Sequence, residues 1–342
     1  YDRNLNTIER VSLNSEGEEN VENVQASGIS GDGRFVTFTT SGLLFPENIV
    51  GVNNIFVYDR DMQELEFVSK NEGGEEGDGD SIRSSISDDG RYVVFESDAT
   101  NLVPGDINNR ADIFVYDRDT DTITREVLFD DGDPYYMNGN NGELTVSGDG
   151  QHIVYVRFDE NTFLTNIFLF DRESDTTEQI DVSSDEVSGD DSASFPAVSE
   201  DSRYIVFQSN ATNLTADVVG GSGAVFLRDR TLGTTELIGD EYITGNGYVS
   251  ADGPVVVSSD GRYVFYSASD EGGDNLHLYR YDREENIELL ITEGVGVADG
   301  GASALYPDVS DDGTVVSFTS SNTNLVIGDT NGVADVFVWE EV

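Results

Sequence analysis

The stretch Ser87-Asp88-Asp89-Gly90-Arg91-Tyr92-Val93-Val94-Phe95 contains the pattern that decides the fold. Asp-Gly favours a tight hairpin turn, because glycine adopts a positive φ at no steric cost. The four residues after Arg91 are β-branched or aromatic, which is typical of a buried strand. A second strand-like run ends in Ile86, directly before the phrase. The stretch therefore predicts a β-hairpin.

This phrase occurs six times, and its copies begin at Ser30, Ser87, Ser147, Ser199, Ser258 and Ser310. Successive serines are 57, 60, 52, 59 and 52 residues apart. A third strand follows in each unit, as in Ile113-Phe114-Val115-Tyr116-Asp117-Arg118, and a fourth follows it, as in 64–68. Helical periodicity is absent. The pattern predicts six units of four antiparallel strands.

The two ends of the chain complement each other. The sixth unit ends at Trp339 without a fourth strand, whereas Thr7 to Val11 reads as a fourth strand without its first three. We therefore predict an all-β, six-bladed β-propeller in which the N-terminal strand closes the last blade. An open solenoid is the alternative, and it would need polar capping repeats. We expect one domain over 1–342, with blades at about 13–69, 70–128, 129–182, 183–238, 239–291, and 292–342 plus 1–12.

The repeat resembles a known group of propellers. The phrase at 87–95, the run Ala99-Thr100-Asn101-Leu102-Val103-Pro104-Gly105-Asp106 and the third strand at 112–118 together look like the WD-type repeat of TolB-like proteins. The resemblance covers the whole chain and implies a six-bladed ring. It leaves the activity open, because fold does not fix function. Relatives include binding modules of the bacterial envelope and propeller domains of peptidases, so the resemblance implies a secreted, periplasmic or cell-surface location.

The charge of the chain restricts its partners. Asp and Glu number 68 against 18 Lys and Arg, for a formal net charge of −50, and Lys70 is the single lysine. Such a chain repels phosphate, which argues against nucleic acid and against an anionic membrane surface. No apolar run is long enough for a membrane span. Self-repulsion at this charge is relieved by salt, so the composition predicts a protein adapted to high salt; an acidic secreted protein with bound calcium is the alternative.

Two loops predict a calcium site. Oxygen-bearing side chains at positions 1, 3 and 7 of a loop resemble the start of an EF-hand loop, although the bidentate Glu at position 12 is missing. An Asx-rich turn that caps the third strand is the alternative interpretation. The candidate ligands are Asp106, Asn108 and Asp112 in one loop, and Asp329, Asn331 and Asp335 in the other.

The repeated polar residues predict structure rather than catalysis. The Asp of each phrase suits turn chemistry, and the Asp-Arg pair after each third strand suits ion pairing between strands or blades. The chain has no Cys, and neither His152 nor His277 follows a nucleophile motif. We assign no catalytic residue and expect a non-catalytic scaffold.

The loops before each first strand predict a ligand-binding face, since binding residues often lie on loops of a rigid scaffold. We expect a monomer that binds a protein, peptide or glycan there. The alternatives are a hydrolase or lyase at the channel mouth, the gate domain of a larger peptidase, and a structural spacer. The candidate ligand-binding residues are Arg83, Glu143, Phe195, Tyr306 and Asp308.

Overall fold

The computed structural model describes most of the chain, and every regular element in the described part is a β-strand. It describes residues 9–14, 22–45, 51–108, 110–127, 135–136, 144–216, 223–239, 253–269, 276–292, 304–321, 325–326 and 333–341. The chain forms two compact units, one of residues 1–137 and 144–153 and one of residues 138–143 and 154–342. No helix in the described part is long and apolar enough to cross a membrane.

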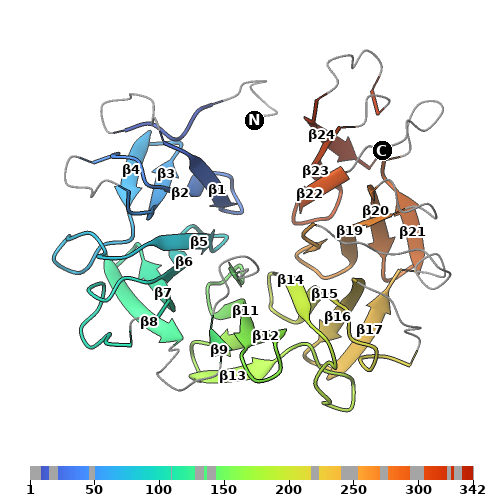
Figure 1. Cartoon of the computed structure of the whole chain (residues 1–342). Coiled ribbons are helices and arrows are strands. Elements are labelled where there is room, and N and C mark those ends of the chain that lie inside the picture. The colour runs from blue at the N-terminus through green and yellow to red at the C-terminus, as the bar shows by residue number, and fades with distance from the viewer. Residues whose placement is uncertain are drawn as a thin grey trace. The chain divides into compact units, whose positions relative to one another are not determined.

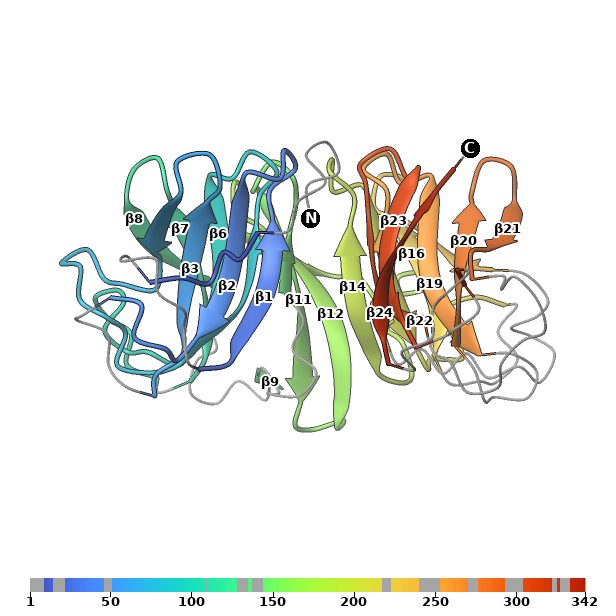
Figure 2. The ribbon, with the colours of Figure 1, turned by 90° about the horizontal axis from the view of Figure 1, so that it is seen from above.

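The first unit contains two complete antiparallel sheets (Figure 1). Blade 1 has the order β1-β2-β3-β4, with bounds Val24–Ile29, Phe35–Thr40, Asn54–Asp59 and Glu64–Phe67. Blade 2 has the order β5-β6-β7-β8, with bounds Ser81–Ile86, Tyr92–Ser97, Asp112–Asp117 and Thr122–Val127. Figure 2 shows β1, β2 and β3 side by side in this order. The short strands β9 (Tyr135–Tyr136) and β10 (Leu144–Val146) follow.

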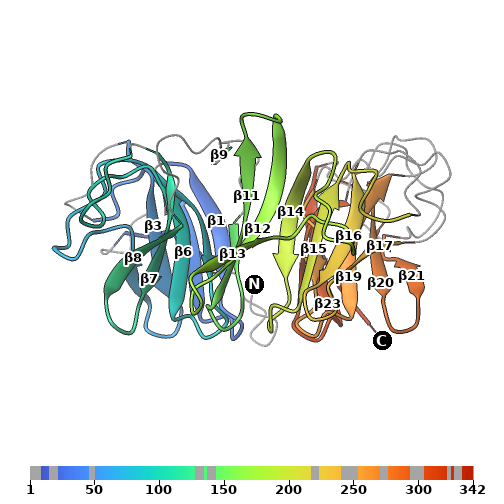
Figure 3. The ribbon, with the colours of Figure 1, turned by 90° about the horizontal axis from the view of Figure 1, so that it is seen from below.

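The other sheets repeat this order, as β14 to β17 show in Figure 3. Blade 3 has β10 followed by β11 (His152–Asp159), β12 (Leu164–Asp171) and β13 (Thr176–Gln179), and β9 also pairs with β11. Blade 4 has β14 (Ala193–Val198), β15 (Tyr204–Ser209), β16 (Ala224–Asp229) and β17 (Thr234–Ile238). Blade 5 has β18 (Val256–Val257), β19 (Tyr263–Ser269), β20 (Leu276–Asp282) and β21 (Ile287–Leu290). Blade 6 has β22 (Ala304–Val309), β23 (Val315–Ser320) and β24 (Asp335–Glu340).

Six sheets of consecutive antiparallel strands make the fold an all-β, six-bladed β-propeller, which confirms the predicted fold class. Five blades have the four consecutive strands that the repeat predicts. Blade 6 has three strands in the described part of the chain. Residues 1–8 lie outside the described residues, so pairing of the N-terminal strand with the last blade stays a prediction, as does the single-domain organisation.

The hydrophobic core lies between neighbouring blades. Ile55 and Val57 of β3 pack in one cluster with Val93 and Phe95 of β6, and all four side chains are buried. Similar clusters join blades 3 and 4, blades 4 and 5, and blades 5 and 6. Successive side chains of a strand point to opposite faces, so a blade with apolar residues at every position can pack on both sides. This explains why these strands read as continuous apolar runs.

The turns of the repeated phrase also join blades, through their backbones. The N–H of Gly31 donates to the carbonyl of Asp88 at 3.0 Å, and the N–H of Asp88 donates to the carbonyl of Gly148 at 3.0 Å. In the second unit, Ser259 donates in the same way to Asp311 at 2.9 Å. The second residue of the phrase therefore links successive blades. These hydrogen bonds require that the turn has the same geometry in each of these blades.

The N-terminal segment contacts blade 1 as the fourth strand of a preceding blade would. Glu9 lies 3.5 Å from the Tyr58 hydroxyl and accepts a hydrogen bond from Nε of Arg60 at 3.2 Å. Glu66 of β4 makes the matching contacts to blade 2, at 3.0 Å from Tyr116 and 2.8 Å from Arg118. Residue 9 therefore has the contacts that the repeat assigns to a fourth strand.

Candidate functional site

The repeated Asp and Arg residues form structural contacts, as predicted from the sequence. Asp89 accepts hydrogen bonds from the Ser87 hydroxyl at 2.7 Å and from the Arg91 N–H at 2.9 Å, which fixes the turn. Asp117 binds the Arg91 guanidinium through both oxygens, at 2.9 and 2.7 Å. Bidentate pairs of this kind are strong and geometrically specific. They recur with the repeat and so are parts of the scaffold.

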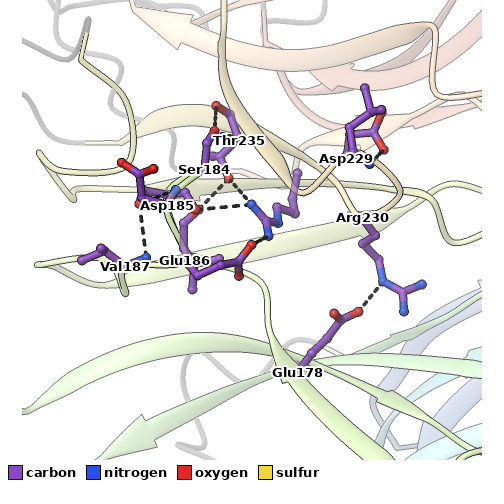
Figure 4. Close-up of polar contacts among 12 residues, drawn as sticks. Glu178, Ser184, Asp185, Glu186, Val187, Asp229, Arg230 and Thr235 are labelled. Carbon is purple, nitrogen blue, oxygen red and sulfur yellow. Dashed lines mark hydrogen bonds and ion pairs between the residues drawn. The ribbon is translucent and has the colours of Figure 1, made fainter.

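Arg118 connects blade 2 to blade 1. Its Nε donates to Glu66 at 2.8 Å, its Nη1 donates to the carbonyl of Gly90 at 2.6 Å, and its guanidinium lies 4.0 Å from the centre of the Phe35 ring. Figure 4 shows the equivalent contact between blades 3 and 4, where Arg230 donates to Glu178. The prediction that the Asp-Arg pairs join strands and blades is confirmed.

The structure brings the first set of candidate metal ligands together. The side chains of Asp106 and Asp112 are 1% and 0% exposed, and Nη1 of Arg125 lies 2.7 and 3.1 Å from their oxygens. The Asn108 amide donates to both oxygens of Asp112, at 3.2 and 3.0 Å. Sequence reasoning missed Arg125, which lies on β8.

The second set of candidate metal ligands is only partly described. Asp335 is the first residue of β24 and pairs with Ser320. Asp329 and Asn331 lie outside the described residues. In the described part of the chain, no three His, Cys, Asp or Glu side chains form a group that could hold a metal ion. Calcium binding stays a prediction, and any such site would need amide or backbone oxygens as well.

Three of the five candidate ligand-binding residues share a strained backbone. Arg83, Phe195 and Tyr306 have φ values of 52°, 52° and 55°, in the left-handed region that bulky residues rarely adopt. Each lies on the first strand of its blade, at a shift in strand register. A β-bulge of this kind turns a side chain away from the regular alternation of the strand, and bulges are frequent beside functional sites.

The remaining two candidates differ from these three. Asp308 lies on β22 after the register shift, opposite Ser317, and surrounding protein atoms raise the pKa of its carboxyl. Glu143 lies outside the described residues. The left-handed backbone is therefore shared by Arg83, Phe195 and Tyr306, and their role in binding stays a prediction.

Arg83 contacts a buried acid that sequence reasoning missed. Its guanidinium donates to Glu96 of β6, whose side chain is 5% exposed. Burial raises the pKa of Glu96, and the Arg83 charge opposes this shift. The neighbouring Asp98 also has a raised pKa, through partial desolvation and the charge of Asp80. Other blades carry Thr39, Val156, Gln208, Ser267 or Thr319 at the position of Glu96.

On the first strands in the described part of the chain, left-handed non-glycine residues occur in blades 2, 4 and 6, and the matching position of blade 3, Glu143, lies outside the described residues. The spacings of the repeated serine also vary, since 57, 52 and 52 residues alternate with 60 and 59.

Asp181 is a fully buried carboxylate in the described part of blade 3. It accepts hydrogen bonds from the Asn166 amide at 2.8 Å and from the Ile167 N–H at 3.0 Å. In blade 1 the Ser69 hydroxyl accepts the matching N–H of Ile55 at 3.0 Å. Asp181 therefore has a structural counterpart that carries no charge.

We expect Asp181→Ser to change the pH dependence of stability. Burial raises the pKa of Asp181 to about 6, from 3.8. Between these values the folded carboxyl keeps a proton that the unfolded one has lost, so its contribution to the free energy of unfolding falls as pH rises to 6. From pH 4 to pH 7 the variant should gain roughly 1–3 kcal/mol over the parent. Urea unfolding at both pH values measures this, with the exposed Asp185→Ser as control; parallel profiles of parent and Asp181→Ser would contradict it.

Comparison with known proteins shows the fold alone. No protein-family model and no curated protein matches the chain. The propeller domain of the trilobed protease from Pyrococcus furiosus is similar with a TM-score of 0.58 and 15% identity, over 93% of this chain and 81% of that one. An acylaminoacyl peptidase has a TM-score of 0.58 and 14% identity, over 93% of this chain and 44% of its own.

TolB is also among the solved structures to which the chain is similar. TolB from Acinetobacter baumannii has a TM-score of 0.49 and 14% identity, over 78% of this chain. The chain spans 53% of the length of that TolB chain. The similar structures thus show the propeller fold, and they leave the function of this chain to its own residues.

Proposed function

We propose that the protein is a non-catalytic propeller that binds a protein, peptide or glycan through bulged residues on the first strands of its blades. The observation that supports this most strongly is the left-handed backbone of Arg83, Phe195 and Tyr306. Each such residue costs of order 1–3 kcal/mol, and strain of this kind persists where function requires it. The first strand of each blade borders the central channel of a propeller.

The chemistry of the three side chains suits a polar ligand with flat or apolar parts. Aromatic and guanidinium groups dominate the energetics of binding interfaces, because they combine contact area with few rotatable bonds or with directed hydrogen bonds. Tyr306 is 62% exposed, so its ring is available to a ligand. We place the ligand outside the cytoplasm, where the protein acts as a secreted, periplasmic or cell-surface monomer.

Glycine substitution tests this proposal, because it removes both the side chain and the backbone strain. We expect Phe195→Gly to change stability by less than about 1 kcal/mol, since relief of strain offsets the lost ring contacts. Binding should weaken by about 30-fold or more, as for a central aromatic contact. The probes are peptides selected from a random display library and oligosaccharides on a glycan array, with affinities measured by calorimetry.

Phe163→Gly is the matched control. Phe163 has a φ of 60° and is 74% exposed, but it lies in the turn between β11 and β12 rather than on a first strand. Its substitution should leave binding unchanged. Equal binding by the parent and Phe195→Gly would refute the proposed site, and turnover of a peptide or glycan by the parent would support an enzyme instead.

A further inference from the structure

We propose that Asp106, Asn108 and Asp112 of blade 2 form a cation site whose resident cation is the guanidinium of Arg125. Nη1 of Arg125 lies 2.7 Å from an oxygen of Asp106 and 3.1 Å from an oxygen of Asp112. The spacing of the loop residues is the one that predicts a calcium site from sequence. In the folded chain a side chain from the neighbouring strand β8 reaches the place that a metal ion would take.

The burial of the two carboxylates requires a cation beside them. Their side chains are 1% and 0% exposed, and the Arg125 side chain is 16% exposed. Transfer of an unpaired carboxylate out of water is costly, and a paired one is stable only while its partner remains. The guanidinium therefore holds together a loop that would otherwise contain two buried negative charges.

The coordination of Asp106 points to a site for a cation rather than to an ordinary ion pair. Both of its carboxylate oxygens are buried, and within the described part of the chain neither accepts a hydrogen bond, so that the ion pair with Arg125 at 2.7 Å is the contact that compensates their charge. A carboxylate that only stabilised a turn would accept backbone N–H groups, as Asp89 does from Arg91. Carboxylate oxygens are among the ligands that Ca²⁺ takes in proteins.

Comparison among the blades supports the assignment. In each of the five blades with a described fourth strand, one residue of that strand pairs with an aromatic residue of the third strand. In blade 2 this aromatic residue is Phe114, which lies two positions after Asp112. Its partner on the fourth strand is Arg125. The corresponding residues elsewhere are Phe67, Gln179, Leu237 and Leu290.

The residue that corresponds to Asp112 also differs from blade to blade, as does the residue that corresponds to Arg125. The other blades with a described fourth strand have Asn54, Asn166, Ala224 or His277 there. Among these five blades, the arginine thus occurs where the buried aspartate occurs. The positive charge of Arg125 and the negative charge of Asp112 thus occur in the same blade. This is the expected pattern if the guanidinium takes the role of a bound ion.

The test is to remove the guanidinium and to supply a metal ion in its place. We expect Arg125→Gln in EGTA to melt about 5–10 °C below the parent in EGTA, because the carboxylates lose their cation. Millimolar CaCl₂ at constant ionic strength should recover at least half of that difference, and MgCl₂ should recover less, because Mg²⁺ tolerates irregular geometry poorly. The variant and the parent both contain the residues 329–335, so any effect of calcium there cancels in the difference between their melting temperatures.

Two further variants make the result decisive. Arg125→Gln combined with Asp106→Asn should lose the calcium recovery, and Arg125→Lys should keep most of the parent stability without metal. If Arg125→Gln does not fold in EGTA, folding that depends on CaCl₂ supports the proposal. The proposal would be overturned if Arg125→Gln and the parent had the same melting temperature in EGTA. It would also be overturned if CaCl₂ did not reduce the loss of stability of Arg125→Gln.

Discussion

The melting temperature of the protein should rise by at least about 10 °C between roughly 10 mM and molar KCl. The formal net charge of −50 is distributed over 342 residues with 18 basic side chains. At low ionic strength the charges interact over a Debye length of about 30 Å, which spans several blades. At molar salt this length falls to about 3 Å, and the repulsion is screened.

The ion pairs seen in the structure work in the opposite direction, but their contribution is smaller. Many of them are partly exposed, as between Arg60 and Glu9, and salt weakens such pairs by less than about 1 kcal/mol each. The buried pairs, such as Arg125 with Asp106, are screened much less. Repulsion among the excess acids should therefore dominate the response to salt.

A variant with less negative charge is the control for this expectation. Glu72, Glu173 and Glu285 are exposed, and replacing all three by Lys reduces the net negative charge by six. The dependence of the melting temperature on KCl should become shallower in this variant. A melting temperature of the parent that does not change with KCl, measured by differential scanning calorimetry, would exclude adaptation to high salt.

Gly90→Ala should destabilise the protein by about 3 kcal/mol or more, through both backbone strain and a steric clash. Gly90 has a φ of 70°, and a Cβ atom at this position would lie 2.1 Å from Cδ2 of Phe35 in the preceding blade. The ring cannot move freely, because the guanidinium of Arg118 lies 4.0 Å from its centre. The added methyl group must therefore push blades 1 and 2 apart locally.

Gly74→Ala separates the two causes. Gly74 has a similar φ of 78°, but no atom lies within 4 Å of the Cβ that alanine would add. Its substitution should cost only the backbone strain, about 1–2 kcal/mol. Urea unfolding of both variants gives the comparison. Equal losses of stability would show that contact between the turn and the preceding ring is unimportant.

The fold was predictable because it depends on short-range patterns. The turn at Asp89-Gly90 and the apolar runs around it specify local hairpins, and their sixfold recurrence specifies blades. The structural role of the Asp-Arg pairs followed from the same recurrence. Closure by the N-terminal strand involves residues 1–8 and remains a prediction.

The candidate site was predictable only in part. The sequence predicts Arg83, Phe195 and Tyr306 as part of the loop face, whereas the structure places them on the first strands, and the sequence carries no direct signal for their left-handed backbone. Glu96 lies 13 residues from Arg83, on the adjacent strand, and no local pattern in the sequence indicates that the two side chains meet. Arg125 was missed for the same reason, since it lies 13 residues after Asp112 and meets it only across the β7–β8 pair.

By itself, the sequence determined the number of blades, their strands and turns, and the acidic character of the chain, because all of these follow from local propensity, periodicity and composition. Tertiary structure alone decided which charges meet. It placed Arg125 between Asp106 and Asp112, and Arg83 against Glu96. The physical reason is that an ion pair or a strained bulge depends on the register between strands, and register is set by packing of whole blades rather than by any single stretch of residues.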